Sequence, residues 1–177
     1  STTLPRVHVA LMTMEKVVET VEEAAAVLEL LPRSAAGQVL PGYVSFLAGP
    51  RREDEFDGPQ ALHLVIVDNG RSRLLADPVM REALACIRCG ACLNVCPVWC
   101  KAGGHAYGGV YSGPIGSLLT PLLELTHDGW ELPFACTQCK ACAEVCPARI
   151  DQPALLLELR NRSRLPKPRT AVRLFAF

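Results

Sequence analysis

Apolar and polar positions divide this chain into two parts that meet near residue 76. The first part, residues 1–75, is typical of an α/β arrangement, in which β-branched and apolar runs flank a helical pattern. These runs predict three strands, at Val7–Met12, Tyr43–Leu47 and Leu62–Val67. The second part, from Ala76 onward, predicts helices separated by cysteine-containing loops.

Capping and turn residues place the local boundaries in the first part. Thr20 followed by Glu23 forms a capping box, so a helix is expected to begin there. Pro32 is expected to end that helix because proline has no N–H to donate. The Asp68-Asn69-Gly70 segment is a tight-turn signal, which predicts that Arg73–Leu75 returns as the second arm of a hairpin.

The second part carries helical periodicity between its cysteines. Asp77 followed by Pro78 predicts a capped helix that runs into Cys86. Apolar residues share one helical face in Pro114–Leu125, and a last helix is expected over Pro153–Arg160. The second part is therefore predicted to be mostly α-helical.

Eight of the nine cysteines form two copies of one pattern, Cys-x2-Cys-x2-Cys-x3-Cys-Pro. The first copy is Cys86, Cys89, Cys92 and Cys96, and the second copy is Cys136, Cys139, Cys142 and Cys146. This pattern holds 4Fe–4S clusters through soft thiolate ligands. Two copies predict two 4Fe–4S clusters and hence a protein that transfers electrons.

The spacing also predicts which cysteines share a cluster. In two-cluster ferredoxins the fourth cysteine of each run ligates the other cluster. The first cluster is therefore assigned to Cys86, Cys89, Cys92 and Cys146. The second cluster is assigned to Cys136, Cys139, Cys142 and Cys96.

Zinc and disulfides explain the cysteines less well. Structural zinc sites are built from paired Cys-x2-Cys units, without the third evenly spaced cysteine and the following proline. A disulfide framework conflicts with the odd cysteine count and with three cysteines inside seven residues. The ninth cysteine, Cys100, is expected to be a small buried thiol near a cluster, and an auxiliary redox or ligand role is the alternative.

Composition and charge indicate the class of partner and the compartment to be expected for this protein. The chain has 177 residues, 50% of them hydrophobic, and a formal net charge of zero, so its overall charge gives no reason to expect a nucleic-acid partner. No apolar run reaches the length of a membrane span. The first residues lack the basic and apolar regions of a targeting peptide, and many reduced thiols favour the cytoplasm.

Two further segments have open interpretations. The Gly-rich loop 103–116 either shields a cluster or forms a docking or small-molecule surface in which His105 and Tyr107 line the entry or exit of the electron. Residues 161–177 form a basic C-terminal tail. A solvated terminus is the first interpretation of this region, and a docking surface for an acidic partner or lipid is the alternative. The basic residues concerned are Arg160, Arg162, Arg164, Lys167, Arg169 and Arg173.

Four strings carry a family resemblance. They are LLPRSAAGQ (Leu30–Gln38), LHLVIVDNGRSRLLADP (Leu62–Pro78), REALACIRCGACLNVCPV (Arg81–Val98) and GGHAYGGVYSGPIG (103–116). The chain resembles the iron–sulfur subunit of the bacterial lactate-utilisation system to about residue 165. The resemblance implies part of an α/β lactate-utilisation (LUD) domain over 1–75, followed by an α-helical two-cluster ferredoxin domain over 76–160.

The resemblance also implies a function. The family forms a cytoplasmic complex of three proteins that oxidises L-lactate to pyruvate, and this subunit is its electron carrier. Its partners are a cysteine-rich redox subunit and a LUD-domain subunit without clusters. An electron-transfer subunit of another quinone-linked or heterodisulfide-reductase-like dehydrogenase complex is the alternative. No catalytic base with a substrate clamp is visible, so the chain alone is not expected to turn over lactate.

The chain departs from the family in two respects. Ala36 stands where the family usually has threonine, so any role of that hydroxyl is absent. The family is also much longer, and the remaining α/β part is too small to bury a large core. The missing half is therefore expected to be supplied by another chain or by self-association, or to have been removed from a longer protein.

Overall fold

The protein is described by a computed structural model that covers residues 4–124 and 129–163. The chain forms two compact units, residues 1–90 and residues 91–177. Within the described residues, no helix has both the length and the apolar character needed to cross a membrane.

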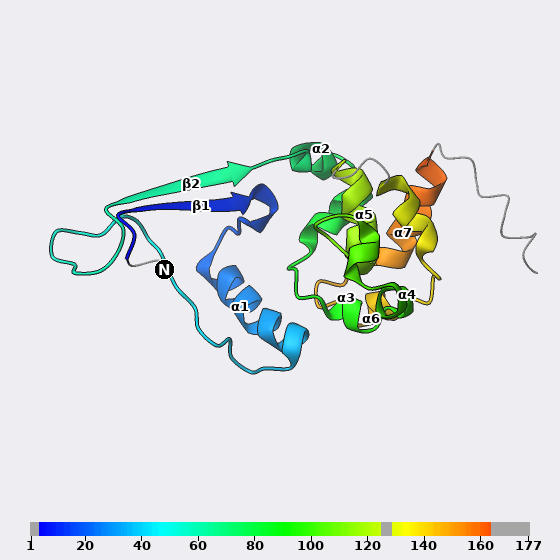
Figure 1. The fold of residues 1–177 in the computed structure, drawn as a ribbon, viewed down its shortest axis with the longest axis horizontal. Coiled ribbons are helices and arrows are strands. Elements are labelled where there is room, and N and C mark those ends of the chain that lie inside the picture. Colours follow the sequence, from blue (N-terminus) through cyan, green and yellow to red (C-terminus); the bar gives the residue numbers. More distant parts are fainter. Residues whose placement is uncertain (1–3, 125–128, 164–177) are drawn as a thin grey trace, which may run out of the picture. The chain divides into compact units, whose positions relative to one another are not determined.

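The first unit contains a parallel pair of strands. Strand β1 (Val7–Thr13) pairs with β2 (Ala61–Val67) in continuous register, and the short 3-10 helix η1 (Met14–Lys16) follows β1 directly (Figure 1). Helix α1 (Val21–Ala36) lies between the strands in sequence, as expected because parallel strands cannot be joined by a hairpin. The strands predicted at Val7–Met12 and Leu62–Val67 are confirmed, and so is the α/β class of this part of the chain.

Helix α1 begins as predicted and ends later than predicted. The Thr20 hydroxyl accepts the N–H of Glu23 at 3.1 Å, which confirms the cap. Pro32 does not end the helix; the helix continues to Ala36, and Gly37, with φ +69°, donates its N–H to Arg33. A proline costs its own N–H bond but leaves the later bonds in place, so a well-placed glycine decides the end instead.

Two predictions about the first unit are wrong. No strand forms over Tyr43–Leu47, where Tyr43 and Phe46 are exposed. The Asp68–Gly70 turn leads into helix α2 (Arg71–Leu75) rather than into a hairpin. The Asp68 carboxylate accepts the N–H and the hydroxyl of Ser72, at 2.6 and 2.7 Å, so it acts as a cap that starts a helix.

The segment before the first cysteine is helical, as predicted, but of the 3-10 type. Helix η2 (Met80–Ala85) packs against α2 and leads directly to Cys86. The helix begins at Met80 rather than at Pro78, and the Asp77 carboxylate accepts the N–H groups of Val79 and Met80, at 3.0 and 2.9 Å, at the start of the segment.

The second unit is a set of short helices around α5. Its elements are α3 (Ala91–Asn94), α4 (Pro97–Ala102), η3 (Gly104–Tyr107), α5 (Gly113–Leu122), η4 (Gly129–Ala135), α6 (Ala141–Glu144) and α7 (Gln152–Arg162). Helix α5 contacts α3, α4, α7, η3 and η4, and its Leu118 and Leu119 are fully buried. Figure 1 shows α5 among the helices of this unit. Both helices predicted here from periodicity, α5 and α7, are present, and the mostly helical character is confirmed.

Candidate metal centre

The two cysteine runs have the same local backbone. Each residue of the second run lies 50 positions after its counterpart in the first. Arg88 and Gln138 are counterparts, both in the left-handed region at φ +64° and +59°. The N–H of Arg88 donates to the Cys86 sulfur, and that of Gln138 donates to the Cys136 sulfur, each at 3.4 Å. The sequence repeat is therefore also a structural repeat that directs N–H groups at sulfur.

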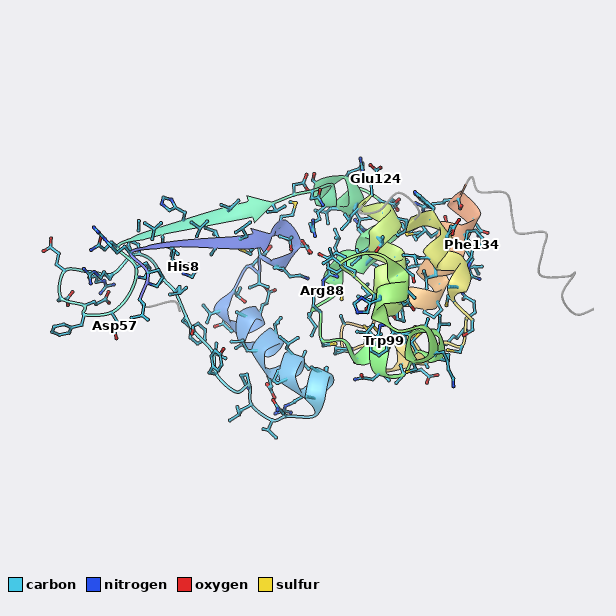
Figure 2. All side chains as sticks on the ribbon, in the orientation of Figure 1. His8, Asp57, Arg88, Trp99, Glu124 and Phe134 are labelled. Carbon is cyan, nitrogen blue, oxygen red and sulfur yellow. The ribbon has the colours of Figure 1, made fainter. Side chains whose placement is uncertain are left out.

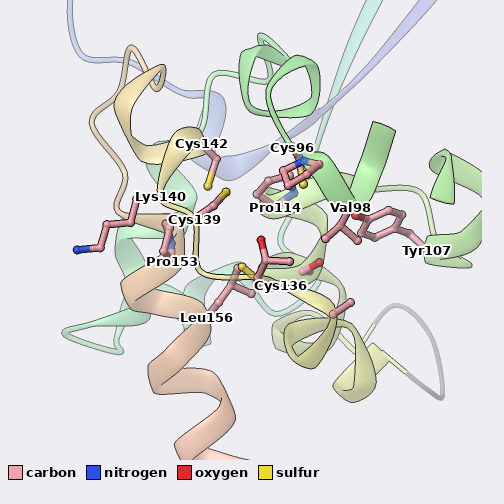
Figure 3. Close-up of a pocket in the computed structure, with 14 residues that line it drawn as sticks. Cys96, Val98, Tyr107, Pro114, Cys136, Cys139, Lys140, Cys142, Pro153 and Leu156 are labelled. Atoms are coloured by element: carbon pink, nitrogen blue, oxygen red, sulfur yellow. The ribbon is translucent and has the colours of Figure 1, made fainter. Parts of the chain in front are cut away.

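Four cysteines from both runs line one pocket of the second unit. They are Cys96, Cys136, Cys139 and Cys142, and Figure 3 shows them around the pocket with Pro114, Pro153 and Leu156. Cys142 is buried, whereas Cys139 is exposed at the pocket's edge. The structure thus brings together the four residues that the sequence assigned to the second cluster.

Burial favours the neutral forms of two ionisable groups in this pocket. Burial raises the pKa of the Cys142 thiol to about 12, and the nearby Cys136 and Cys92 add to the effect. Burial likewise raises the pKa of Tyr107 to about 12, with contributions from Cys96 and Cys136. A metal that coordinates such a thiol reverses this preference, because a coordinating thiol is deprotonated.

The donor set fits an iron–sulfur cluster. Four soft sulfur ligands surround one largely apolar pocket, and N–H groups reach the sulfurs of Cys136 and, from Trp99 at 3.5 Å, of Cys96. Such hydrogen bonds to sulfur and exclusion of water are the means by which proteins tune these clusters. Within residues 4–124 and 129–163, no three His, Cys, Asp or Glu side chains converge as they would around a single metal ion.

The cysteines assigned to the first cluster fall in both units. Cys86 and Cys89 belong to the first unit, and Cys92 and Cys146 to the second. Cys92 lies on α3 and Cys146 closely follows α6, and these two helices are in contact. The grouping of these four cysteines stays a prediction, as does the domain boundary at residue 75.

A charged cluster in the first unit holds the Cys86 loop, and sequence reasoning missed it. The Glu15 carboxylate lies 2.7 Å from Arg71 Nε, 3.7 Å from the guanidinium of Arg88 and 3.9 Å from Lys16 Nζ. Lys16 also donates to the backbone carbonyl of Cys86. Figure 2 shows Arg88 in the loop that carries the first cysteines. These residues come from distant segments, so no local pattern in the sequence could reveal the cluster.

Burial and neighbouring groups shift the pKa values of both Glu15 and Lys16. Burial of the Glu15 side chain, only 4% exposed, favours the neutral acid, but hydrogen bonds from Arg71 and Thr13 outweigh it and lower the pKa of Glu15. Burial lowers the pKa of Lys16, and repulsion from Arg88 lowers it further, against the attraction of Glu15. Glu15 is therefore the anion that holds three cations beside the first cysteine.

Arg160 holds the start of the second run. Its Nε donates to the carbonyl of Pro133 at 2.8 Å, and its Nη2 donates to the carbonyl of Cys136 at 2.5 Å. The guanidinium also lies 5.9 Å from the ring centre of Phe134, which is labelled in Figure 2. The interpretation of Arg160 as part of a solvated terminus is therefore wrong.

The structure also places Arg162 and Cys100, for which the sequence made predictions. Arg162 pairs with Glu158 on α7 at 2.7 Å. The predictions for Arg164, Lys167, Arg169 and Arg173 lie outside the described residues. Cys100 is exposed on α4 rather than buried, because the helix directs it away from the core, with its sulfur 3.8 Å from the Asn94 carbonyl oxygen.

The Gly-rich loop lies against the pocket. Tyr107 is buried and lines the pocket, whereas His105 is exposed. Trp99 Nε1 donates to the Ser112 hydroxyl at 3.1 Å, which ties the loop to α4. These contacts support the interpretation of the loop as a cover for the pocket.

Known families match both parts of the chain. The LUD domain family matches residues 1–67, and the 4Fe-4S dicluster domain family matches residues 82–150. The chain is thus an iron–sulfur protein in which part of an α/β LUD domain precedes a helical ferredoxin domain. No solved structure matches it significantly.

Its curated relatives are lactate utilization proteins. It is 54% identical to lactate utilization protein B of Shouchella clausii over 135 residues, which are 76% of this chain and 28% of that protein. It is 52% identical to the proteins of that name from Macrococcus caseolyticus and Anoxybacillus flavithermus over 159 residues, 90% of this chain and 33% and 34% of theirs. The chain is thus similar to lactate utilization protein B over most of its own length and spans about a third of these relatives' length.

Proposed function

We propose that this chain holds two 4Fe–4S clusters and relays electrons in a cytoplasmic complex that oxidises L-lactate to pyruvate. Cys86, Cys89, Cys92 and Cys146 would hold the first cluster. Cys96, Cys136, Cys139 and Cys142 would hold the second, and their common pocket is the observation that carries this proposal. The family names of the relatives support the role in lactate utilisation.

The chemistry requires a relay because the electron counts differ. Oxidation of lactate to pyruvate releases two electrons and two protons, whereas each cluster accepts one electron. Two clusters held by this chain would supply two one-electron sites, so that the pair could be taken up singly and passed to an acceptor outside the chain. The residues of this chain fix the positions, exclude water and donate N–H groups to sulfur.

Partners complete the proposal. A cysteine-rich redox subunit and a LUD-domain subunit would bind lactate and exchange electrons with this chain. The β1–β2 pair also leaves apolar side chains exposed, among them Val9, Leu11 and Ile66. A partner, a second copy or further chain of the LUD domain would cover them, since parallel sheets are normally covered on both faces.

Serine substitutions test the ligand assignment. We expect wild-type protein purified without oxygen to contain about eight iron and eight sulfide per chain and two paramagnetic clusters on reduction. Cys96→Ser and Cys136→Ser should alter the same cluster signal, and Cys86→Ser the other signal. Cys100→Ser is the matched control, and it should alter neither signal because Cys100 is exposed on α4 and does not line the pocket.

Two results would contradict the assignment. Zinc in place of iron would remove the electron-transfer role. Damage to one signal by both Cys86→Ser and Cys96→Ser, with Cys136→Ser altering the other, would show that each run holds its own cluster. The role in lactate utilisation is tested separately: lactate should reduce the clusters only when the partner subunits are added.

A further inference from the structure

Two cations occupy equivalent places in the two cysteine runs. Lys16 donates to the backbone carbonyl of Cys86, and Arg160 donates to the backbone carbonyl of Cys136. Cys86 and Cys136 are the first cysteines of the two runs and are counterparts in the repeat. In each run, therefore, one cationic side chain donates a hydrogen bond to the backbone carbonyl of the first cysteine.

The two cations are not part of the repeat itself. Lys16 is the last residue of η1, in the part of the chain that matches the LUD domain. Arg160 lies on α7, which follows the second run in sequence. Two unrelated segments thus place a positive charge at equivalent carbonyls of the two runs. Because duplication of the sequence does not explain this agreement, the positive charge itself is the feature that needs an explanation.

Both cations are held in place by further contacts. Lys16 joins Glu15, which also binds Arg71 and Arg88, and the Glu15 and Arg71 side chains are almost fully buried. Arg160 makes a second hydrogen bond, to Pro133, and lies over the Phe134 ring. Ordered, partly buried charges act more strongly on a neighbouring group than solvated ones do.

We propose that Lys16 and Arg160 are matched positioning residues, each of which sets the reduction potential of its own cluster. The inference rests on the proposed function, in which Cys86 ligates the first cluster and Cys136 the second. Reduction adds one negative charge to a cluster, so a fixed cation nearby stabilises the reduced form and raises the potential. Lys16 thereby makes the LUD-domain part a component of the first redox centre.

Neutral variants that keep a hydrogen-bond donor isolate the effect of charge. Lys16→Gln and Arg160→Gln are titrated anaerobically against wild type, with the two clusters followed by paramagnetic resonance. We expect each variant to lower the potential of its own cluster and leave the other unchanged. The expected shift corresponds to about a tenfold change in the ratio of oxidised to reduced cluster at fixed solution potential, roughly 59 mV for one electron.

Three control variants separate the effect of the lost charge from other effects of the substitution. Lys16→Arg and Arg160→Lys keep the charge and should restore most of the potential. Lys101→Gln removes an exposed lysine at the end of α4, and it should shift neither cluster because its charge is solvated. Iron content and absorbance of each variant report whether both clusters are retained.

The outcomes separate this inference from the proposed function. Equal shifts in both clusters, or no shift with both clusters present, would overturn the inference and leave the two-cluster assignment intact. Loss of the cluster beside the substituted residue would show that the residue holds the cluster in place rather than setting its potential, and would also overturn the inference. Absence of two clusters in wild type would instead defeat the proposed function first.

Discussion

At the scale of single residues, close packing limits the loop that covers the pocket. Gly116 on α5 lies directly beneath Tyr111, so that a Cβ atom at position 116 would lie 2.4 Å from the Tyr111 carbonyl oxygen. Backbone atoms cannot rotate away as a side chain does. Glycine at this position therefore allows the loop that contains Tyr107 to approach α5.

Gly116→Ala is expected to destabilise the second unit. Overpacking against backbone typically costs about 1–3 kcal/mol, and thermal unfolding followed by circular dichroism should show a lower midpoint. Gly104→Ala is the matched control in the same loop. Its added Cβ would meet nothing closer than 3.7 Å, so we expect a change within about 0.5 kcal/mol. Equal midpoints for the two variants would show that the loop does not approach α5 this closely.

At the scale of elements, carboxylates begin the helices that carry the site. Asp77 caps η2, which leads into Cys86, and Asp151 caps α7 by accepting the N–H of Ala154 at 3.1 Å. A capping carboxylate satisfies N–H groups that have no partner inside the helix. These short elements depend strongly on their caps because a short helix has few internal hydrogen bonds.

Asp77→Ala is expected to loosen the start of η2. Loss of the cap should cost about 1 kcal/mol, and the amides of Val79 and Met80 should exchange with solvent hydrogen faster. Hydrogen exchange read by mass spectrometry or NMR measures this directly. Asp77→Asn keeps an acceptor oxygen and should retain most of the protection. Unchanged exchange in Asp77→Ala would mean that the cap does not hold this segment.

At the scale of the whole molecule, the first unit exposes apolar surface. Val7, Val9 and Leu11 are alternate residues of β1, so they lie on one face of the strand, and all are more than half exposed. Contiguous apolar surface of this kind marks an interaction face. The second unit differs because it has a buried core, to which α5 contributes Leu118 and Leu119 and α7 contributes Leu156 and Leu159.

The isolated 177-residue chain is accordingly expected to self-associate. Light scattering after size exclusion should give a mass above that of one chain. The double variant Val9→Thr/Leu11→Thr keeps residues that favour strands and should reduce the association. A monomeric wild type with a sharp cooperative melting transition would contradict this expectation.

Local chemistry explains which features could be predicted from the sequence. The cysteine runs, the Thr20 cap and the helices α5 and α7 each depend on residues within one or two turns of one another. A prediction failed where one local sequence pattern is compatible with two different structures. The Asp68–Gly70 turn suits a hairpin, but Ser72 lets Asp68 begin a helix instead.

By itself the sequence determined the class of this protein, because ligand spacing and capping act over a few residues of chain. Tertiary structure alone decided which distant groups surround those ligands. Lys16 reaches Cys86 across 70 positions, and Arg160 reaches Cys136 across 24, through contacts that no periodicity encodes. Charges that act through space depend on how the chain folds back, and so the environment of each cysteine run is a property of the folded molecule.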